Sequence, residues 1–313
     1  TEVQLDLVVF AETAPLEFVK NESKQFGLAK LRFNREPFGL QLEVDSSVQQ
    51  YFYEGVPATA AMKDTAYFWF DTEENFNLIL YDTLGLRDTV RVKPPPRAAF
   101  VENRKLKMQK LETGTIASQL LPGRSLRMLF SHPLSAFDTA GIQLLRDTLP
   151  DIIRPQVSIS TDNSRTLLIE HNWKPTASYK LRIDAGAVTD WYGLTSDTLR
   201  NEFKIPDTKE LGILNIQLSQ LDSTLSYTLD VLNKNNKLVA SYVLQDQSTF
   251  QTTLKNLPPG VYTIKMIEDR NGNGRWDPGN YDRRLQPERR FEKALEELRG
   301  NWEVEAVVEP VFN

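Results

Sequence analysis

The chain has 313 residues, which suggests two or three domains and enough apolar sequence for several cores. Hydrophobic residues make up 40% of it and charged residues 25%, so the composition indicates neither a disordered chain nor a membrane protein. The net charge of −5 and the absence of cysteine exclude a general attraction to nucleic acid or anionic lipid, and also disulfides, thiolate zinc sites and cysteine nucleophiles.

Residues 1–94 contain short strand-like segments separated by turn residues. Apolar or alternating stretches occupy residues 3–10, 28–33, 40–44, 66–70, 76–80 and 89–93. This rhythm predicts an Ig-like β-sandwich over 1–94. The chain opens on strand-like sequence with no initiator methionine and no signal-type segment, so we expect it to be part of a longer or processed polypeptide.

Pro94, Pro95 and Pro96 form the plainest linker in the sequence. Consecutive prolines adopt an extended conformation and donate no backbone hydrogen bonds, so a domain boundary is expected there. Residues 98–111 combine helical and strand-like patterns, and the sequence leaves both structures open.

A second Ig-like sandwich is predicted over residues 97–207. Its strand-like segments are 125–130, 142–145, 156–160, 166–170 and 179–183. Two motifs of the first block recur: the segment 126–133 resembles 31–37, and the segment 190–198, which begins at Asp190, resembles 82–89, which begins at Asp82. We interpret the pair as a duplicated sandwich, with both aspartates in turn-forming positions.

A third domain is predicted over residues 211–313. Strand-like segments at 212–218, 226–232, 237–243, 249–254 and 261–267 predict a meander with a turn at 233–236, and 302–308 predicts a closing strand. For residues 287–298 the flanking Pro287 and Gly300 favour a helix. Its apolar face is thin, which argues against a helix, so a strand stays possible.

The loop that follows residues 261–268 has the spacing of a calcium site. Oxygen donors recur at alternate positions, provided by Asp269, Asn271, Asn273, Arg275 (through its carbonyl) and Asp277. Gly274 permits the sharp turn. A strand enters the loop and the twelfth position is Asn280, so this is no EF-hand; Asp282 could supply the missing carboxylate. The sequence predicts Ca²⁺ here, and the alternative is a metal-free turn held by Asx hydrogen bonds.

No catalytic site is expected elsewhere. His132 and His171, the two histidines, have no convergent partners in the sequence, and no nucleophile elbow or phosphate-binding loop occurs. In the aromatic run 67–70, alternate side chains face opposite sides of a strand. One set is expected in the core; the other is expected either exposed, as a surface for a protein or a glycan, or covered by an adjoining domain.

The sequence resembles the Ig-like-domain lipoproteins of the Bacteroidota cell envelope. In the second block, the residues that follow the rhythm of the bacterial Ig-like module of S-layer-type and surface proteins are 130–133, 173–175, Tyr179, Gly186, Asp190, Gly193 and Phe203. In the third block, residues 257–262, 269–274 and 301–305 resemble a transthyretin- or CnaB-like sandwich. Such proteins have a lipobox cysteine and a further module upstream, so the resemblance implies that this is a C-terminal portion.

The resemblance implies an outer-membrane lipoprotein that faces the periplasm or the cell surface, without known catalytic activity. We therefore expect a non-catalytic structural spacer and protein-interaction module with a Ca²⁺-stiffened loop. Its partner would be an envelope or outer-membrane protein, with no nucleic acid involved. Membrane association would occur only through an anchor outside this sequence. The alternative is a glycan-binding accessory protein that uses exposed aromatic residues.

Overall fold

The structure, a computed structural model, describes residues 14–56, 63–82, 85–102, 104–112, 119–147, 151–279 and 284–312. Regular structure in these residues is almost entirely β, which confirms the all-β prediction; the exceptions are helix α1 (Arg97–Val101) and two short 3-10 turns. No helix in this part of the chain is long and apolar enough to cross a membrane. The strand predicted at 3–10 lies outside the described residues.

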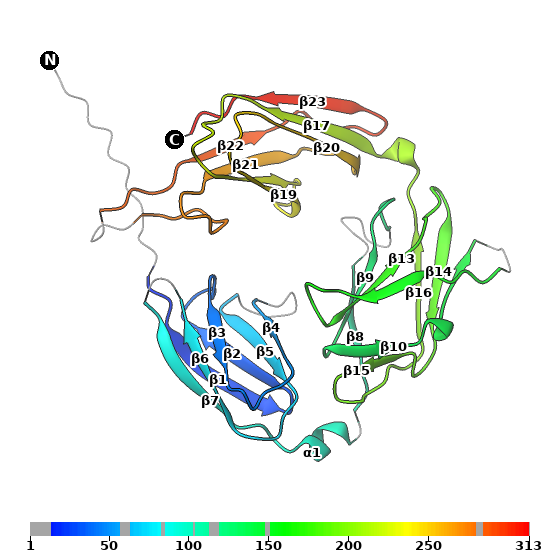
Figure 1. The fold of residues 1–313 in the computed structure, drawn as a ribbon. Helices are drawn as coiled ribbons and strands as arrows, with labels where there is room; N and C mark the ends of the chain where they lie inside the picture. Colours follow the sequence, from blue (N-terminus) through cyan, green and yellow to red (C-terminus); the bar gives the residue numbers. More distant parts are fainter. Residues whose placement is uncertain are drawn as a thin grey trace. The chain divides into compact units, whose positions relative to one another are not determined.

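The chain divides into two compact units, Pro15–Ile205 and one built on Pro206–Asn313. The first unit contains two sandwiches. The earlier one has the strands β1 (Phe18–Gln25), β2 (Leu28–Phe33), β3 (Gln41–Val44), β4 (Tyr51–Glu54), β5 (Thr65–Phe70), β6 (Phe76–Tyr81) and β7 (Arg87–Val92). They form the sheets β1-β2-β5-β4 and β3-β6-β7 (Figure 1). In β6, alternation buries Phe76, Leu78 and Leu80 against the facing sheet.

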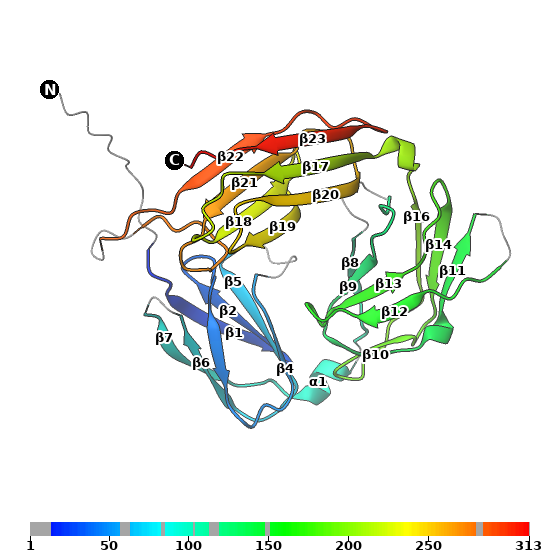
Figure 2. The ribbon, with the colours of Figure 1, turned by 45° about the horizontal axis from the view of Figure 1, so that its top comes forward.

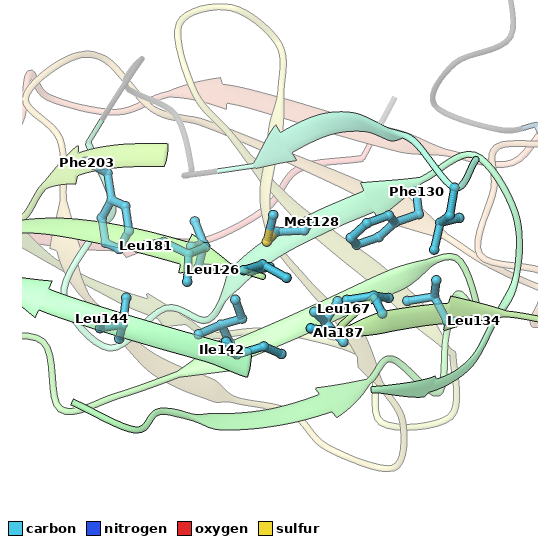
Figure 3. Packing of buried hydrophobic residues seen from close by; sticks show 14 of the residues in the cluster. Leu126, Met128, Phe130, Leu134, Ile142, Leu144, Leu167, Leu181, Ala187 and Phe203 are labelled. Carbon is cyan, nitrogen blue, oxygen red and sulfur yellow. The ribbon is translucent and has the colours of Figure 1, made fainter. Parts of the chain in front are cut away.

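The second sandwich is described by residues 104–112, 119–147 and 151–205. Its strands are β8 (Met108–Glu112), β9 (Leu126–Phe130), β10 (Leu134–Phe137), β11 (Ile142–Arg146), β12 (Gln156–Ile159), β13 (Thr166–Glu170), β14 (Ser178–Ile183), β15 (Val188–Asp190) and β16 (Leu199–Lys204). Side chains of both sheets meet in one core, with Met128 and Phe130 of β9 among them (Figure 3). Residues 98–111 form part of α1 and then β8, so both patterns read in that stretch are present.

The sheet order shows the duplication. The order β8-β9-β13-β12 repeats β1-β2-β5-β4, and β11-β14-β16 repeats β3-β6-β7; the second sandwich adds the ribbon β10-β15. The turn predicted from the recurring aspartates recurs too. Asp82 Oδ1 accepts the N–H of Leu86 at 2.8 Å, and Asp190 Oδ1 accepts the N–H of Leu194 at 2.8 Å. The duplicated sandwich and the turn-forming role of both aspartates are therefore confirmed.

A buried polar contact joins these two sandwiches. Glu54 at the end of β4 and Arg165 before β13 form an ion pair at 2.7 Å, with 7% and 1% of their side chains exposed. Arg165 Nε also donates to the Phe130 carbonyl at 3.0 Å, and its guanidinium lies 5.0 Å from the Trp69 ring. Buried charges persist only when they are paired and hydrogen-bonded, and each of these two charges has its partner in the other sandwich.

Tyr192 forms a second part of the same junction. Its hydroxyl donates to the Gly27 carbonyl at 2.9 Å and lies 3.2 Å from the Phe70 carbonyl, and its ring packs edge-on against Phe26 at 5.6 Å and Phe100 at 5.3 Å. Burial raises its pKa well above the ordinary value. We call these contacts, together with Glu54, Trp69 and Arg165, the junction. The two sandwiches are thus connected by tertiary contacts as well as by the proline linker. The domain boundary at 94–97 stays a prediction.

The second unit is a seven-stranded sandwich. Its strands are β17 (Gly212–Leu218), β18 (Tyr227–Leu232), β19 (Leu238–Leu244), β20 (Phe250–Leu257), β21 (Thr263–Glu268), β22 (Arg290–Ala294) and β23 (Glu303–Val308). The sheets are β20-β17-β23 and β19-β18-β21-β22 (Figure 2). The closing strand is confirmed. The turn at 233–236 is confirmed as well, with the Asn236 N–H donating to the Asn233 carbonyl at 2.8 Å.

Two expectations for this unit are wrong. The strands do not form a simple meander, because β17 pairs with β20 and, in parallel, with β23, so that two facing sheets can bury their apolar sides. The segment favoured as a helix contains the strand β22, which pairs with β21 from Thr263↔Ala294 to Ile267↔Arg290. Ladder pairing at an open sheet edge outweighs the helical signals of Pro287 and Gly300, because the apolar face is too thin for a helix.

Candidate metal centre

The predicted calcium loop begins where β21 ends, and Asp269 organises it. This carboxylate is 1% exposed. Its Oδ1 accepts the N–H of Asn273 at 3.0 Å, and its Oδ2 accepts the N–H of Gly274 at 2.7 Å and the hydroxyl of Thr228 at 3.3 Å. The two N–H groups converge because Gly272 and Gly274 adopt φ of +71° and +74°. The loop therefore winds around one buried carboxylate.

Asp277 gathers the side chains at the open side of the loop. Its Oδ2 accepts the amide N–H₂ of Asn271 at 2.6 Å and that of Asn273 at 3.1 Å. The amide oxygens accept backbone N–H groups instead. Asn271 Oδ1 accepts the N–H of Asn273 at 3.1 Å, and Asn273 Oδ1 accepts the N–H of Arg275 at 2.8 Å. Two amide groups thus neutralise part of the charge on one carboxylate oxygen.

Glu288 is a member of this site that the sequence did not reveal. It is 5% exposed, and its two oxygens accept the N–H groups of Arg270 at 2.8 Å and Asp277 at 3.0 Å. Burial raises its pKa, and the carboxylates of Asp277 and Asp269 raise it further. The helix expected over 287–298 hid it. Had the strand β22 been predicted, Glu288, two residues before it, would have been expected next to the loop.

Neighbouring charges fasten the loop to the sheet. Glu268, the last residue of β21, is 3% exposed in its side chain and accepts Arg289 Nε at 2.7 Å and Arg270 Nε at 3.3 Å. The Trp276 indole N–H donates to the Glu288 carbonyl at 2.6 Å. These bonds hold the entry and the exit of the loop together.

The structure brings together the side chains of four of the predicted site residues. Asp269, Asn271, Asn273 and Asp277 lie in one hydrogen-bonded loop, to which Arg275 contributes its N–H; their role as metal ligands stays a prediction. Asp282 lies outside the described residues. Within the described part of the chain, no group of three or more histidine, cysteine, aspartate or glutamate residues is arranged to hold a metal ion. The Asx hydrogen bonds of the metal-free alternative are present, and calcium stays a prediction.

The side-chain oxygens of Asn271 and Asn273 would face Asp277 only if both amide groups rotated. An amide group presents oxygen in place of nitrogen when it rotates by half a turn, and the two atoms are alike in size. Rotating Asn271 and Asn273 in this way would turn their oxygens toward Asp277 Oδ2, and it would also break the bonds that these oxygens accept from the N–H groups of Asn273 and Arg275. Calcium accepts such mixtures of carboxylate, amide and carbonyl oxygens.

The remaining residues singled out in the sequence have structural surroundings. His132 is buried, and its Nδ1 lies 2.8 Å from Asp190 Oδ2. In the aromatic run, Phe68 and Phe70 belong to the core of the first sandwich, while Trp69 is buried in the junction. The expectation that an adjoining domain covers the second set is confirmed for Trp69. Tyr51, with 51% exposed, is the large aromatic residue of this sheet that faces solvent.

A family model matches part of the last unit. A family model described as an uncharacterized protein conserved in bacteria (DUF2141) matches residues 215–281, a stretch that includes the loop 269–279. The match covers less than half of the chain. No curated protein matches the chain.

Solved structures with several β modules are similar to it. The N-terminal part of the bacterial S-layer protein SbsC is 14% identical over 54% of this chain and 42% of its own, with a TM-score of 0.29. The Escherichia coli alpha-2-macroglobulin fragment spanning domains MG0-NIE-MG1 is 14% identical over 55% and 69%, also at 0.29. The chicken CNTN1 FN1-FN3 domains are 12% identical over 89% and 97%, at 0.20. This chain spans less than half of the SbsC structure, and at these values the similarity carries no argument about function.

Proposed function

We propose that this chain is a non-catalytic part of a cell-envelope protein, a stiff spacer that also binds a protein partner. The junction is the observation that carries this proposal. Modules joined only by a linker move independently by default, whereas here a buried ion pair and a buried tyrosine hydroxyl tie two sandwiches together. A fixed pair of sandwiches spans distance at a defined angle, which is what a spacer requires.

The envelope location is supported by the sequence resemblance to Ig-like-domain lipoproteins of the Bacteroidota. An outer-membrane lipoprotein would be anchored through a residue outside this sequence. Fractionation of native cells tests this proposal. The full protein is expected with the outer membranes and in the detergent extract; recovery in the soluble cytoplasmic fraction would contradict it.

A partner protein is the second element of the proposal. Purified chain immobilised as bait should capture a specific outer-membrane protein from envelope extract, and free chain should compete with the capture. The captured protein is expected to stay bound when the bait is washed at physiological salt. A blank at high bait concentration would count against a partner.

We propose further that Ca²⁺ binds the loop between Asp269 and Asp277 and stiffens it. The support is the gathering of two asparagine side chains around the Asp277 carboxylate and the buried anchor at Asp269. Extracellular modules bind calcium at roughly 10⁻⁴–10⁻³ M. At 10 mM Ca²⁺ such affinities stabilise the folded unit by about 1.4–2.7 kcal/mol, which calorimetry resolves as a rise of a few degrees in melting temperature.

The calcium experiment compares three chains. Asp277→Asn removes the carboxylate that the two amides share, and Asp269→Ala removes the buried anchor. Asp207→Asn is the matched control, because Asp207 caps a 3-10 turn of the same unit with one bond to the Lys209 N–H at 3.0 Å. Wild type and control should show binding heat and the thermal shift, and both loop variants should lose them. A wild-type chain with neither signal would remove calcium from the account.

A further inference from the structure

A groove at one end of the second sandwich has properties that the spacer function does not use. Arg146 ends β11, Gln156 begins β12, and His171 directly follows β13, so three strands present polar side chains at the same end. Two adjoining depressions of about 360 and 370 Å³ share His171 and Asn172. Each has the size of a small-molecule site. We call the residues lining them the basic groove: Arg146, Asp151, Ile153, Arg154, Gln156, Glu170, His171, Asn172 and Lys174.

Positive charge dominates around His171. Burial lowers its pKa, and the cations of Arg146 and Lys174 lower it further. Neither cation forms an ion pair with a carboxylate of the described residues, whereas Arg154 donates to the Ala140 carbonyl. In a chain of net charge −5, two cations held beside a half-buried imidazole mark a place for an anionic group.

The imidazole ring of His171 packs against aromatic side chains of the sandwich. Its ring packs edge-on against Trp173 at 5.3 Å and against Tyr179 at 5.8 Å. Trp173 is buried, and its indole N–H donates to the Arg124 carbonyl at 2.9 Å. The ring is therefore positioned by the core, and its orientation does not depend on a ligand.

The groove also contains neutral and acidic groups, and these decide the class of ligand. Asn172 and Gln156 present planar amides suited to hydroxyl groups. Asp151 and Glu170 would repel a densely charged polyanion, and Glu170 already accepts the Ser125 hydroxyl at 2.7 Å. A ligand with many hydroxyl groups and isolated negative charges satisfies both sets.

We propose that the basic groove binds an acidic saccharide, with Arg146, Lys174 and His171 at its oxyanion and with Asn172 and Gln156 at its hydroxyl groups. The site lies within Pro15–Ile205, independent of the calcium loop and of any protein partner. Binding strengthens as the pH falls through the pKa of His171, because the protonated ring attracts the oxyanion. Arg146, Arg154 and Lys174 oppose that protonation, and Asp151 and Glu170 favour it.

The test uses the full chain and the imidazole resonances of its two histidines. His132, buried against Asp190, serves as the internal reference. Trigalacturonate should shift the His171 resonances saturably and raise the pKa of His171, while His132 stays in place. Maltotriose, which is neutral, should have no effect, and inorganic phosphate should bind at least tenfold more weakly than trigalacturonate.

Charge-removing variants complete the test. Arg146→Gln combined with Lys174→Gln should weaken trigalacturonate binding at least tenfold. Lys180→Gln, an exposed change on β14 of the same sandwich, should leave it unchanged. The unchanged His132 resonances show that each variant is folded. Absence of a His171 response to trigalacturonate, or an equal response to maltotriose, would overturn the proposal. Equal affinity for phosphate would reduce it to a simple anion site and overturn the saccharide part.

Discussion

At the scale of single residues, a few buried carboxylates hold whole loops of this protein by hydrogen bonds. Asp269 collects two backbone N–H groups and a hydroxyl, and Asp190 collects the N–H groups of Tyr192 and Leu194 together with His132. In both places a carboxylate accepts backbone N–H groups that have no partner in a helix or a strand ladder. Losing such a carboxylate leaves several buried donors without partners, which costs more than the hydrogen bonds contribute on balance.

Asp269→Ala should lower the free energy of unfolding even without calcium. The N–H of Gly274 would lose its acceptor and that of Asn273 one of its two, and a lost intramolecular hydrogen bond costs about 0.5–1.5 kcal/mol, or more when the acceptor is charged. Urea unfolding followed by Trp fluorescence measures the change. The control Asp207→Asn, which affects one exposed cap, should cost less than about 1 kcal/mol. Equal effects of the two changes would contradict the central position of Asp269.

Gly27→Ala tests the junction with a single methyl group. Gly27 has φ of +80°, and an added Cβ would lie 2.3 Å from the Tyr192 hydroxyl. Gly39→Ala is a matched control, with φ of +68° and no atom within 4 Å of the added carbon. Both changes bear the cost of a left-handed residue, about 1–2 kcal/mol. Gly27→Ala should cost a further 1–3 kcal/mol or so through overpacking.

Chemical denaturation of both glycine variants provides the comparison. The junction account requires that the Gly27 variant unfold at lower denaturant concentration than the Gly39 variant. Identical midpoints would show that Tyr192 does not press on Gly27 in solution.

At the scale of elements, the strands were the most predictable feature. The stretch 28–33 coincides with β2, and the segment predicted at 76–80 lies within β6, because alternating burial leaves a direct mark on sequence. Strands without that mark were not predicted. β1 buries none of its residues fully, and β4 buries Glu54, a charged residue whose partner lies 111 positions away. Such an ion pair depends on tertiary context that no local pattern contains.

The loop from Asp269 to Asp277 was predictable for a similar reason, whereas its calcium stays a prediction. Its donors lie within nine residues, so their spacing in the sequence is also their spacing in space. Glu288 reaches the loop from another segment and was not predicted. The junction was not predictable either, although the aromatic run indicated that one of its faces needed a cover.

The ion pair between β4 and the loop before β13 gives a prediction at this scale. Arg165→Met removes one partner and leaves Glu54 buried without its cation, which should cost about 3–5 kcal/mol. The double variant Glu54→Gln with Arg165→Met removes both charges and should recover part of that loss. Thermal unfolding of the wild type, Arg165→Met, Glu54→Gln and the double variant measures the coupling. A double variant as unstable as the sum of its single changes would indicate that the two side chains do not interact.

At the scale of the whole molecule, the main feature is the duplicated sandwich of the first unit. The two sandwiches of Pro15–Ile205 have the same sheet order, and the ribbon β10-β15 is the addition that distinguishes the second. Strand β15 of that ribbon ends at Asp190, and Tyr192 lies two residues further along the chain. Tyr192, which comes after this ribbon, contacts the first copy, as does Arg165 before β13.

Stiffness is measured most directly by the distance between two spin labels in the full chain. Because the protein has no cysteine, Asn77→Cys and Lys180→Cys introduce unique attachment points on exposed positions of β6 and β14. Double electron–electron resonance should give one narrow distance distribution, and Gly27→Ala should broaden it. A broad distribution in the otherwise unchanged chain, as expected for two modules connected only by the linker at 94–96, would contradict the account.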